Sequence, residues 1–247
     1  MFKLLFSFFI LLHIIGDFYL QTDNISKRKN EQYRYVFLHS IIYAVIFIVG
    51  SIAIWSGQIF FLILILSFLH FMIDSFKYIY IKYINYPNEL NKFKLYFIDQ
   101  LLHIVSFVIA AVFAVCKGYT ASLLPWAENM LMSINISELA VLSWACILLI
   151  ICKPANITIK KMLLNYKPDL TNDDTSNNAG AFIGSLERLI IVLLLSVNQY
   201  SAIGLVLTAK SVARYDKISK DQIFSEYYLL GTLLSTLYVI VAFSIFI

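Results

Sequence analysis

Charged residues are scarce in this sequence, since Asp, Glu, Lys and Arg make up only 14% of its 247 residues. The net charge of +4 is too small to indicate a nucleic-acid partner. The three cysteines, Cys116, Cys146 and Cys152, have no paired spacing, so they indicate neither a disulfide framework nor a cysteine-based metal site. A phosphate-binding glycine loop, a Gly-x-Ser-x-Gly elbow and a His-Glu-x-x-His motif are also missing from the sequence.

Apolar residues dominate instead, because 60% of the chain is hydrophobic and several runs reach the ~20 residues that cross a bilayer. The sequence predicts an all-α, polytopic transmembrane bundle with about seven membrane segments. The first segment lacks the small-residue cleavage site of a signal peptide, so we expect it to be retained. The predicted segments are residues 2–20, 36–55, 58–80, 95–116, 138–152, 182–198 and 228–247.

The basic residues of the loops predict the topology. Residues 21–35 hold four Lys and Arg residues, whereas the turn at 55–58 has none, so the positive-inside rule places the first loop in the cytoplasm and the N-terminus outside a bacterial inner membrane. Residues 181–227 fit either one span with an interfacial helix or a re-entrant hairpin. The predicted parts are a four-helix unit (1–125), a fifth span with its flanks (126–164), a polar cytoplasmic linker (165–180) and a C-terminal membrane unit (181–247).

The most informative residues are the histidines. The chain has four of them, and all fall in the first four predicted spans. Three have an aspartate four residues away, which is far more than nine aspartates in the whole chain would produce by chance. At this spacing both side chains lie on one helix face, so each pair can point into the bundle together. The pairs are His13 with Asp17, His70 with Asp74, and His103 with Asp99.

These pairs are predicted to share one depth in the membrane. The first and third spans run toward the cytoplasm and read His-x-x-x-Asp, whereas the fourth runs away from it and reads "DQLLH", the reverse order. With a rise of ~1.5 Å per residue, the aspartates lie roughly 5 Å inside the cytoplasmic ends and the histidines one turn deeper. The predicted polar layer consists of His13, Asp17, His39, His70, Asp74, Asp99 and His103.

Imidazoles and carboxylates without a thiolate suit first-row transition metals, and we expect Zn or Mn. Seven groups exceed the needs of one tetrahedral ion, so either two ions are bound or some aspartates orient the histidines through their other ring nitrogen. A metal ion with an open position would acidify a bound water. Whichever of Asp17, Asp74 and Asp99 is not a ligand would then serve as a general base.

Two other interpretations of the layer stay open. Histidine and aspartate also form proton or metal-ion pathways in transporters and sensors, and His-Asp pairs can simply join helices by hydrogen bonds. A second polar set has a similar ambiguity. It either gathers an anionic head group or forms ion pairs and interfacial contacts. Its members are Lys77, Arg188, Lys210 and Arg214.

Several spaced motifs give the chain a family resemblance. "HIIGDFYLQT", "FLHSIIY", "HFMIDSFK" and "DQLLH" occur in this order within residues 8–110. In this respect the chain resembles the uncharacterised bacterial membrane proteins known as domain of unknown function 3307. "GAFIGSLERLI", "NQYSAIGLVLTAKSVARY" and "EYYLLGTLLS" are similar to the C-terminal half of longer members. Inward-facing His and Asp also resemble, more distantly, the membrane-bound metal-dependent hydrolases, which would imply metal-dependent hydrolysis.

The sequence therefore predicts an integral membrane protein with a cytoplasm-facing His/Asp metal site that holds one or two divalent transition-metal ions. We expect hydrolysis of a phosphate-containing or lipid-linked substrate, with membrane lipid as the partner and no nucleic acid. The alternatives are a metal- or proton-coupled transporter or sensor, and a structural membrane protein. The sequence does not indicate an oligomeric state.

Overall fold

The structure is a computed structural model that describes residues 1–52, 54, 56–84, 89–121, 123–166 and 176–247. The predicted linker at 165–180 falls largely on residues 167–175, which lie outside the described part of the chain. The described residues are helical or form turns and loops, with no strand among them. This confirms the predicted all-α class.

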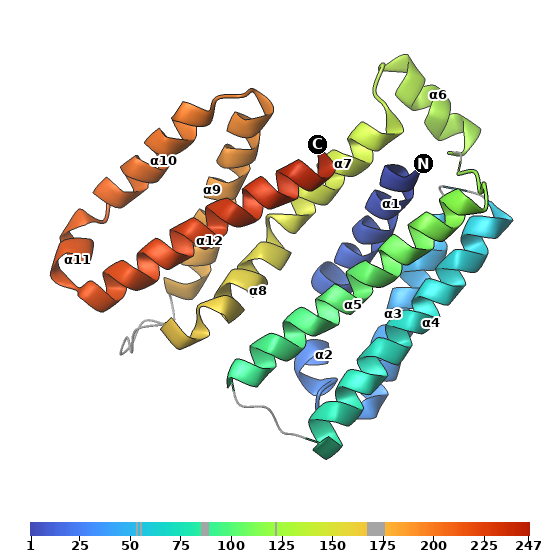
Figure 1. The fold of residues 1–247 in the computed structure, drawn as a ribbon, viewed down its shortest axis with the longest axis horizontal. Helices are drawn as coiled ribbons and strands as arrows, with labels where there is room; N and C mark the ends of the chain where they lie inside the picture. The colour runs from blue at the N-terminus through green and yellow to red at the C-terminus, as the bar shows by residue number, and fades with distance from the viewer. Residues whose placement is uncertain (53, 55, 85–88, 122, 167–175) are drawn as a thin grey trace. The chain divides into compact units, whose positions relative to one another are not determined.

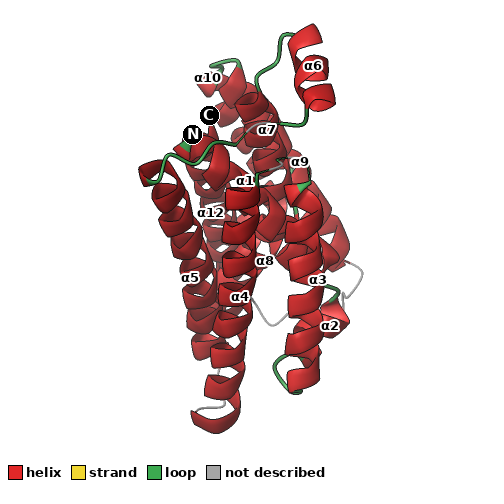
Figure 2. Ribbon diagram, turned by 90° about the vertical axis from the view of Figure 1, so that its right-hand side faces the viewer, coloured by secondary structure: helices red, strands yellow, loops and turns green. Residues whose placement is uncertain are grey.

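The chain divides into two compact units, Met1–Cys146 and Ile147–Ile247. In the first unit, four long helices lie side by side with a short helix at each end of the bundle (Figures 1 and 2). The helices are α1 (Phe2–Ile14), its continuation η1 (Ile15–Leu20), α2 (Asp23–Arg28), α3 (Tyr33–Ser51), α4 (Gly57–Ile79) with η2 (Tyr80–Ile84), α5 (Glu89–Cys116), α6 (Pro125–Ser133) and α7 (Glu138–Ile150), which crosses into the second unit.

The lengths of these helices fit a membrane. Among the described residues, five helices are long and apolar enough to cross a bilayer, and α6 with α7 would add a sixth span bent by 89°. The five are Phe2–Leu20, Tyr33–Ser51, Gly57–Tyr83, Phe93–Cys116 and Gln222–Phe246.

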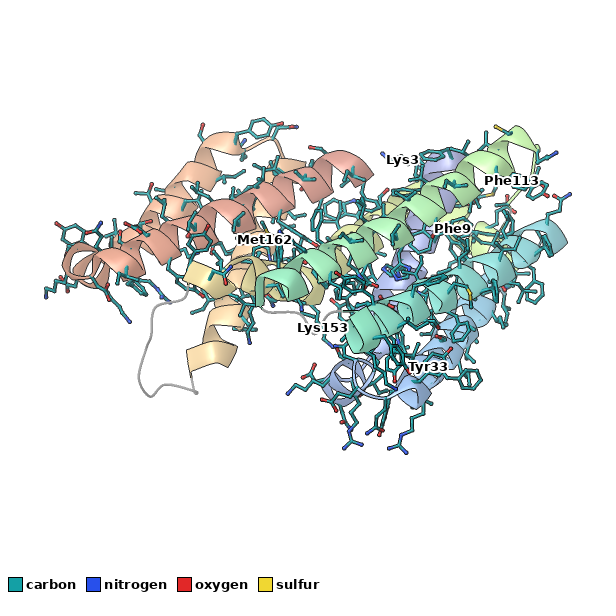
Figure 3. All side chains as sticks on the ribbon, turned by 60° about the horizontal axis from the view of Figure 1, so that its bottom comes forward. Lys3, Phe9, Tyr33, Phe113, Lys153 and Met162 are labelled. Atoms are coloured by element: carbon teal, nitrogen blue, oxygen red, sulfur yellow. The ribbon has the colours of Figure 1, made fainter. Side chains whose placement is uncertain are left out.

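The four long helices of the first unit alternate in direction. α1 and α4 run toward the end that carries α2, and α3 and α5 run away from it (Figure 1). Tyr33 marks the α2 end of the bundle and Lys3 the opposite end (Figure 3). The antiparallel order matches the reversal of the motif from His-x-x-x-Asp to Asp-x-x-x-His that the sequence displays.

Two glycines let α1 approach α3 closely. A Cβ atom on Gly50 would overlap Cδ2 of Leu12, and one on Gly16 would lie 2.8 Å from Cδ2 of Tyr43. Both approaches are closer than van der Waals contact, so neither position has room for a larger residue without movement of its neighbour. Gly16 lies one residue before Asp17, and it therefore brings this carboxylate close to α3.

The end of α1 changes to a π-helix over Ile15–Leu20. A π-helical turn holds one residue more than an α-turn, and such turns are frequent at functional sites. Asp17 lies within this segment, so the wider turn sets the direction of its side chain. α4 also ends in a π-helix, at Tyr80–Ile84, where the chain again approaches the α2 end of the bundle.

The second unit holds α8 (Lys153–Met162), η3 (Leu164–Tyr166), α9 (Ser176–Ser196), α10 (Tyr200–Val212), α11 (Tyr215–Lys220) and α12 (Gln222–Phe246). α9 and α10 are joined by a three-residue turn and pack against each other as a helical hairpin (Figure 1). Asn198 in this turn has a φ of 58°, a left-handed conformation that asparagine tolerates better than most residues. α12 packs against α9 and α8.

Candidate metal centre

All seven residues of the predicted layer are buried and belong to the first unit, where they lie between about the middle of its long helices and the ends nearer to α2. They come from all four long helices. α1 with η1 supplies His13 and Asp17, α3 supplies His39, α4 supplies His70 and Asp74, and α5 supplies Asp99 and His103.

Four donor atoms of this layer converge on one point. Nε2 of His39 lies 3.2 Å from Oδ1 of Asp17 and 3.2 Å from Nε2 of His70. Oδ2 of Asp74 lies 3.6 Å from Nε2 of His39 and 3.7 Å from Nε2 of His70. Oδ1 of Asp17 lies 3.5 Å from Nε2 of His70. Two nitrogens and two oxygens from three helical segments thus face one small space.

The spacing of these atoms fits the shell of a metal ion. Donors placed ~2.0–2.1 Å from a central ion at tetrahedral corners are separated by about 3.3–3.4 Å. Five of the six distances between the four atoms, all those that involve His39 or His70, run from 3.2 to 3.7 Å. Among the described residues, the trios His13–Asp17–His70 and His39–His70–Asp74 each place three ligand atoms within 4.8 Å of one another. Asp17, His39, His70 and Asp74 can therefore hold one ion.

His13 lies next to these four residues and contacts two groups that hold them in place. Its Nδ1 lies 3.3 Å from the Tyr43 hydroxyl, and its Nε2 lies 3.3 Å from Oε1 of Gln100. Both contacts are satisfied when Tyr43 donates to Nδ1 and Nε2–H donates to Gln100. The amide of Gln100 donates to Oδ2 of Asp17 at 3.5 Å, the oxygen turned away from His39. Groups that hold a ligand in this way raise the affinity of a metal site.

The His70 ring is fixed between two other rings. It stacks on Tyr43 with centroids 3.6 Å apart and an interplanar angle of 2°, and on His103 with centroids 4.4 Å apart. The aromatic core begins one turn farther from α2, where the Phe107 ring packs against those of Phe9 and Phe47, with centroids 6.4 Å apart in each pair. The polar layer is therefore bounded by apolar rings on that side.

Lys29 closes the layer at the α2 end. It follows α2 directly, yet its side chain is buried and donates to both oxygens of Asp74, at 3.1 and 3.4 Å. In the amide orientation that satisfies both contacts, Gln21 accepts from Lys29 at 3.0 Å and donates to the backbone carbonyl of Asp17 at 3.1 Å. Burial by itself lowers the pKa of the Lys29 ammonium, but the charges of Asp74, Asp17 and Asp99 outweigh it and raise the pKa above its ordinary value.

Asp99 and His103 form the α5 edge of the layer. Lys77 donates to Oδ2 of Asp99 at 2.8 Å, and Gln100 donates to the same oxygen at 3.4 Å. Oδ1 of Asp99 points instead toward Nε2 of His103, 3.8 Å away. Neither of these two atoms has a hydrogen-bond partner among the described residues. With Asp74 they make a third trio of ligand atoms within 4.8 Å of one another.

The cations predicted to bind a head group have partners inside the protein. Lys77 belongs to the first unit and donates to Asp99, whereas the other three belong to the second. Arg188 is buried and donates to neutral oxygens of Ile151, Asn156, Ser185 and Ser235, and Lys210 donates to Glu187 and Thr232. The guanidinium of Arg214 lies over the Tyr228 ring, 6.0 Å from its centroid.

Sequence reasoning missed three members of the site. Tyr43 lies four residues after His39, on the same helix face, and Gln100 is the neighbour of Asp99, so spacing alone offered a signal for both. In the sequence, Lys29 is one of several basic residues of a predicted cytoplasmic loop. Nothing in its position along the chain distinguishes it from Lys27, because its long side chain reaches back into the bundle.

The family model described as protein of unknown function (DUF3307) matches residues 5–133, slightly more than half of the chain. The chain belongs to this family. The DUF3307 match confirms the resemblance seen in the motifs of residues 8–110, and it contains the whole polar layer together with Lys29 and Lys77. Arg188, Lys210 and Arg214 lie beyond it. Comparison with curated proteins and with solved structures gave no match.

Proposed function

We propose that this protein is a membrane metalloenzyme in which Asp17, His39, His70 and Asp74 hold a divalent transition-metal ion. The proposed reaction is hydrolysis of a phosphate-containing or lipid-linked substrate. The observation that carries the proposal is that the Nε2 atoms of His39 and His70 lie 3.2 Å from each other, and each lies 3.2–3.7 Å from one oxygen of Asp17 and one oxygen of Asp74.

A cation satisfies this set better than protons do. A neutral imidazole has one N–H, so a proton on Nε2 of His39 can be donated to Asp17 or to His70 but not to both. In the same way, a proton on Nε2 of His70 can be donated to only one neighbouring acceptor. Two protonated nitrogens 3.2 Å apart would repel each other, and two unprotonated ones would leave buried acceptors facing each other. One divalent ion between the four atoms accepts electron pairs from all of them at once.

The metal would supply a nucleophile, because a transition-metal ion lowers the pKa of a bound water to about 7. Four protein donors complete a tetrahedral zinc site, whereas Mn²⁺ takes six ligands and leaves room for water and substrate. In the hydrolysis we propose, the water oxygen forms a bond to phosphorus while the bond to the leaving oxygen breaks. One proton of the water passes to a carboxylate of the layer and then to the leaving oxygen, so no oxidant or reductant is required.

The surroundings of the layer support a phosphate-containing substrate. Lys29 and Lys77 are each held by one carboxylate of the layer, Asp74 and Asp99. A metal ion bound by Asp74 would weaken the pair of that carboxylate with Lys29 and leave this ammonium group beside the site, where it would bind a phosphate. We place the α2 end of the bundle in the cytoplasm and the N-terminus outside a bacterial inner membrane, because basic residues gather at the α2 end. There a lipid-linked substrate would present its head group to the layer.

A transport pathway is the less favoured function. A transport pathway needs polar groups along the whole depth of the membrane. Here the helical turn that follows the polar layer, on the side away from α2, is filled by the aromatic rings of Phe9, Phe47 and Phe107. This aromatic packing supports a site that does not continue toward the other side of the bilayer.

The proposal is tested on full-length protein purified in detergent and loaded with Mn²⁺ or Zn²⁺, by elemental analysis of bound metal. The variants are Asp17→Asn and His70→Phe, of which the second keeps a ring between Tyr43 and His103. Ser67→Ala is the matched control, because Ser67 is also buried in α4 but donates to the backbone carbonyl of Ile63 in its own helix. Release of phosphate is then measured on phosphate monoesters, diphosphates and a lipid-linked diphosphate.

We expect stoichiometric metal in the wild type and in Ser67→Ala, and a loss of at least about tenfold in metal affinity in the two site variants. Folded wild-type protein that binds no transition metal would refute the metal site. Bound metal without hydrolysis of any phosphate substrate, together with metal flux into liposomes, would replace the enzyme with a transporter.

A further inference from the structure

We infer that a second divalent cation binds beside the first, at Asp74, Asp99 and His103, and that this second position carries the reactive water. The inference rests on the proposed function and makes it more specific, since it turns a mononuclear site into a dinuclear one. It also assigns a role to Asp99 and His103, which the first ion does not use.

Two unsatisfied atoms define the second position. Oδ1 of Asp99 and Nε2 of His103 face each other at 3.8 Å, which is too long for a hydrogen bond. Their residues are 4% and 1% exposed, and neither atom has a hydrogen-bond partner within the described part of the chain. A buried carboxylate oxygen and a buried imidazole nitrogen without partners each cost free energy, and a cation between them would remove both costs.

Asp74 joins this position to the first one. Its Oδ2 faces His39 and His70, and the same residue forms a trio with Asp99 and His103 whose ligand atoms all lie within 4.8 Å. A carboxylate with two oxygens can bind one ion on each side. Two-metal hydrolases hold their ions about 3.5–4 Å apart, and the pair stabilises the attacking and leaving oxygens of a phosphoryl group together.

The two positions differ in the number of protein donors. The first has four, which complete a tetrahedral shell, whereas the second has the three donors of Asp74, Asp99 and His103. A three-donor site keeps an open position, which is typical of catalytic rather than structural metal ions. The water that attacks phosphorus would therefore bind at the second ion, and the first ion would fix Asp74.

Charge balance specifies the substrate further. The layer holds three carboxylates and two ammonium groups, those of Lys29 and Lys77. One divalent ion would make it net positive by one charge, and two would make it net positive by three. Such an excess in a buried site calls for an anion, so the dinuclear form predicts a substrate with a doubly charged phosphate or a diphosphate group.

The test counts ions and detects whether they are neighbours. Full-length protein in detergent is loaded with Mn²⁺, and bound metal is measured by elemental analysis and by electron paramagnetic resonance. The variants are Asp99→Asn, which keeps the shape of the side chain, and His103→Phe, which keeps a ring against His70. Ser106→Ala is the matched control on α5, because its hydroxyl is part-buried and donates to a backbone carbonyl of its own helix.

We expect two equivalents of Mn²⁺ with a spin-coupled spectrum in the wild type and in Ser106→Ala. Both site variants should retain about one equivalent with the six-line spectrum of an isolated ion, and their phosphate release should fall by at least about 100-fold. One equivalent in the wild type, unchanged in both variants, would refute the second position and leave the proposed function intact. Two equivalents retained in both variants would refute the assignment of Asp99 and His103. A wild type without metal would refute the proposed function itself.

Discussion

Lys29→Met tests whether the lysine and a metal ion compete for the same carboxylate. The substitution keeps most of the apolar stem of the side chain and removes the ammonium that lies 3.1 Å from Oδ2 of Asp74. In metal-free protein, Asp74 then stays buried without a counter-charge. In metal-loaded protein, the ion supplies that charge, and the variant also removes a repulsion between ammonium and ion.

The size of the effect follows from the burial of the pair. The side chains of Lys29 and Asp74 are 8% and 1% exposed, so solvent screens their attraction little. Removal of one partner from a buried pair costs about 3–5 kcal/mol, and for a chain of this size 1 kcal/mol shifts the melting temperature by roughly 2–4 °C. We therefore expect a fall of roughly 6–20 °C in chelator and a much smaller fall with metal bound.

Thermal unfolding in detergent, with and without metal, measures this difference at near-neutral pH. Because the pKa of Lys29 is raised, its stabilising charge is fully present below the ordinary lysine pKa and is lost only as the pH rises above it. Lys27→Met is the control, since Lys27 is exposed on α2, two residues before Lys29, and should change stability little under either condition. An equal loss with and without metal in Lys29→Met would refute the competition.

Three further predictions concern the packing and the topology. Gly16→Ala should destabilise the protein by about 1–3 kcal/mol, because its Cβ would lie 2.8 Å from the Tyr43 ring, whereas Gly204→Ala, which has open space, should stabilise it by about 0.5–1 kcal/mol in the same thermal unfolding experiment. Tyr43→Phe keeps the ring but loses the hydroxyl at Nδ1 of His13, so metal affinity measured by titration should fall about 10–100-fold, and an unchanged affinity would remove Tyr43 from the site. A cysteine at Asn30 should react with an impermeant thiol reagent only in inverted membranes, and labelling of intact cells would reverse the topology.

The membership of the polar layer could be predicted from the sequence because helix geometry and chain direction together determine it. A spacing of four residues puts His70 and Asp74 on one face, and the reversed order of Asp99 and His103 follows from the opposite direction of α5. These rules act within one helix or on its direction, and they are independent of how the helices pack.

The contacts within the layer could not be predicted in the same way. Spacing pairs His13 with Asp17 and His70 with Asp74, yet the imidazole nitrogen and the carboxylate oxygen of these pairs lie 3.8 and 3.7 Å apart. The contacts that His39 makes with Asp17 and His70 on other helices are shorter, at 3.2 Å. Which helices touch, and at what rotation, depends on side-chain packing along their whole length. The burial of Lys29 could not be predicted from the sequence either, because a loop residue has no periodicity to indicate where its side chain points.

The π-helix at Ile15–Leu20 lets the first helix hold one more residue without turning its faces. Each residue of an α-helix advances the face by about 100°, but a π-turn takes up an extra residue within one turn, so the helix before it and after it keeps its register. Deletion of a single residue between 15 and 20 would let the segment become α-helical while His13 and the residues that bury α1 kept their faces. The change would fall on the wider turn itself and on the direction of Asp17, so such a deletion should spare the packing of α1 and disturb the polar layer.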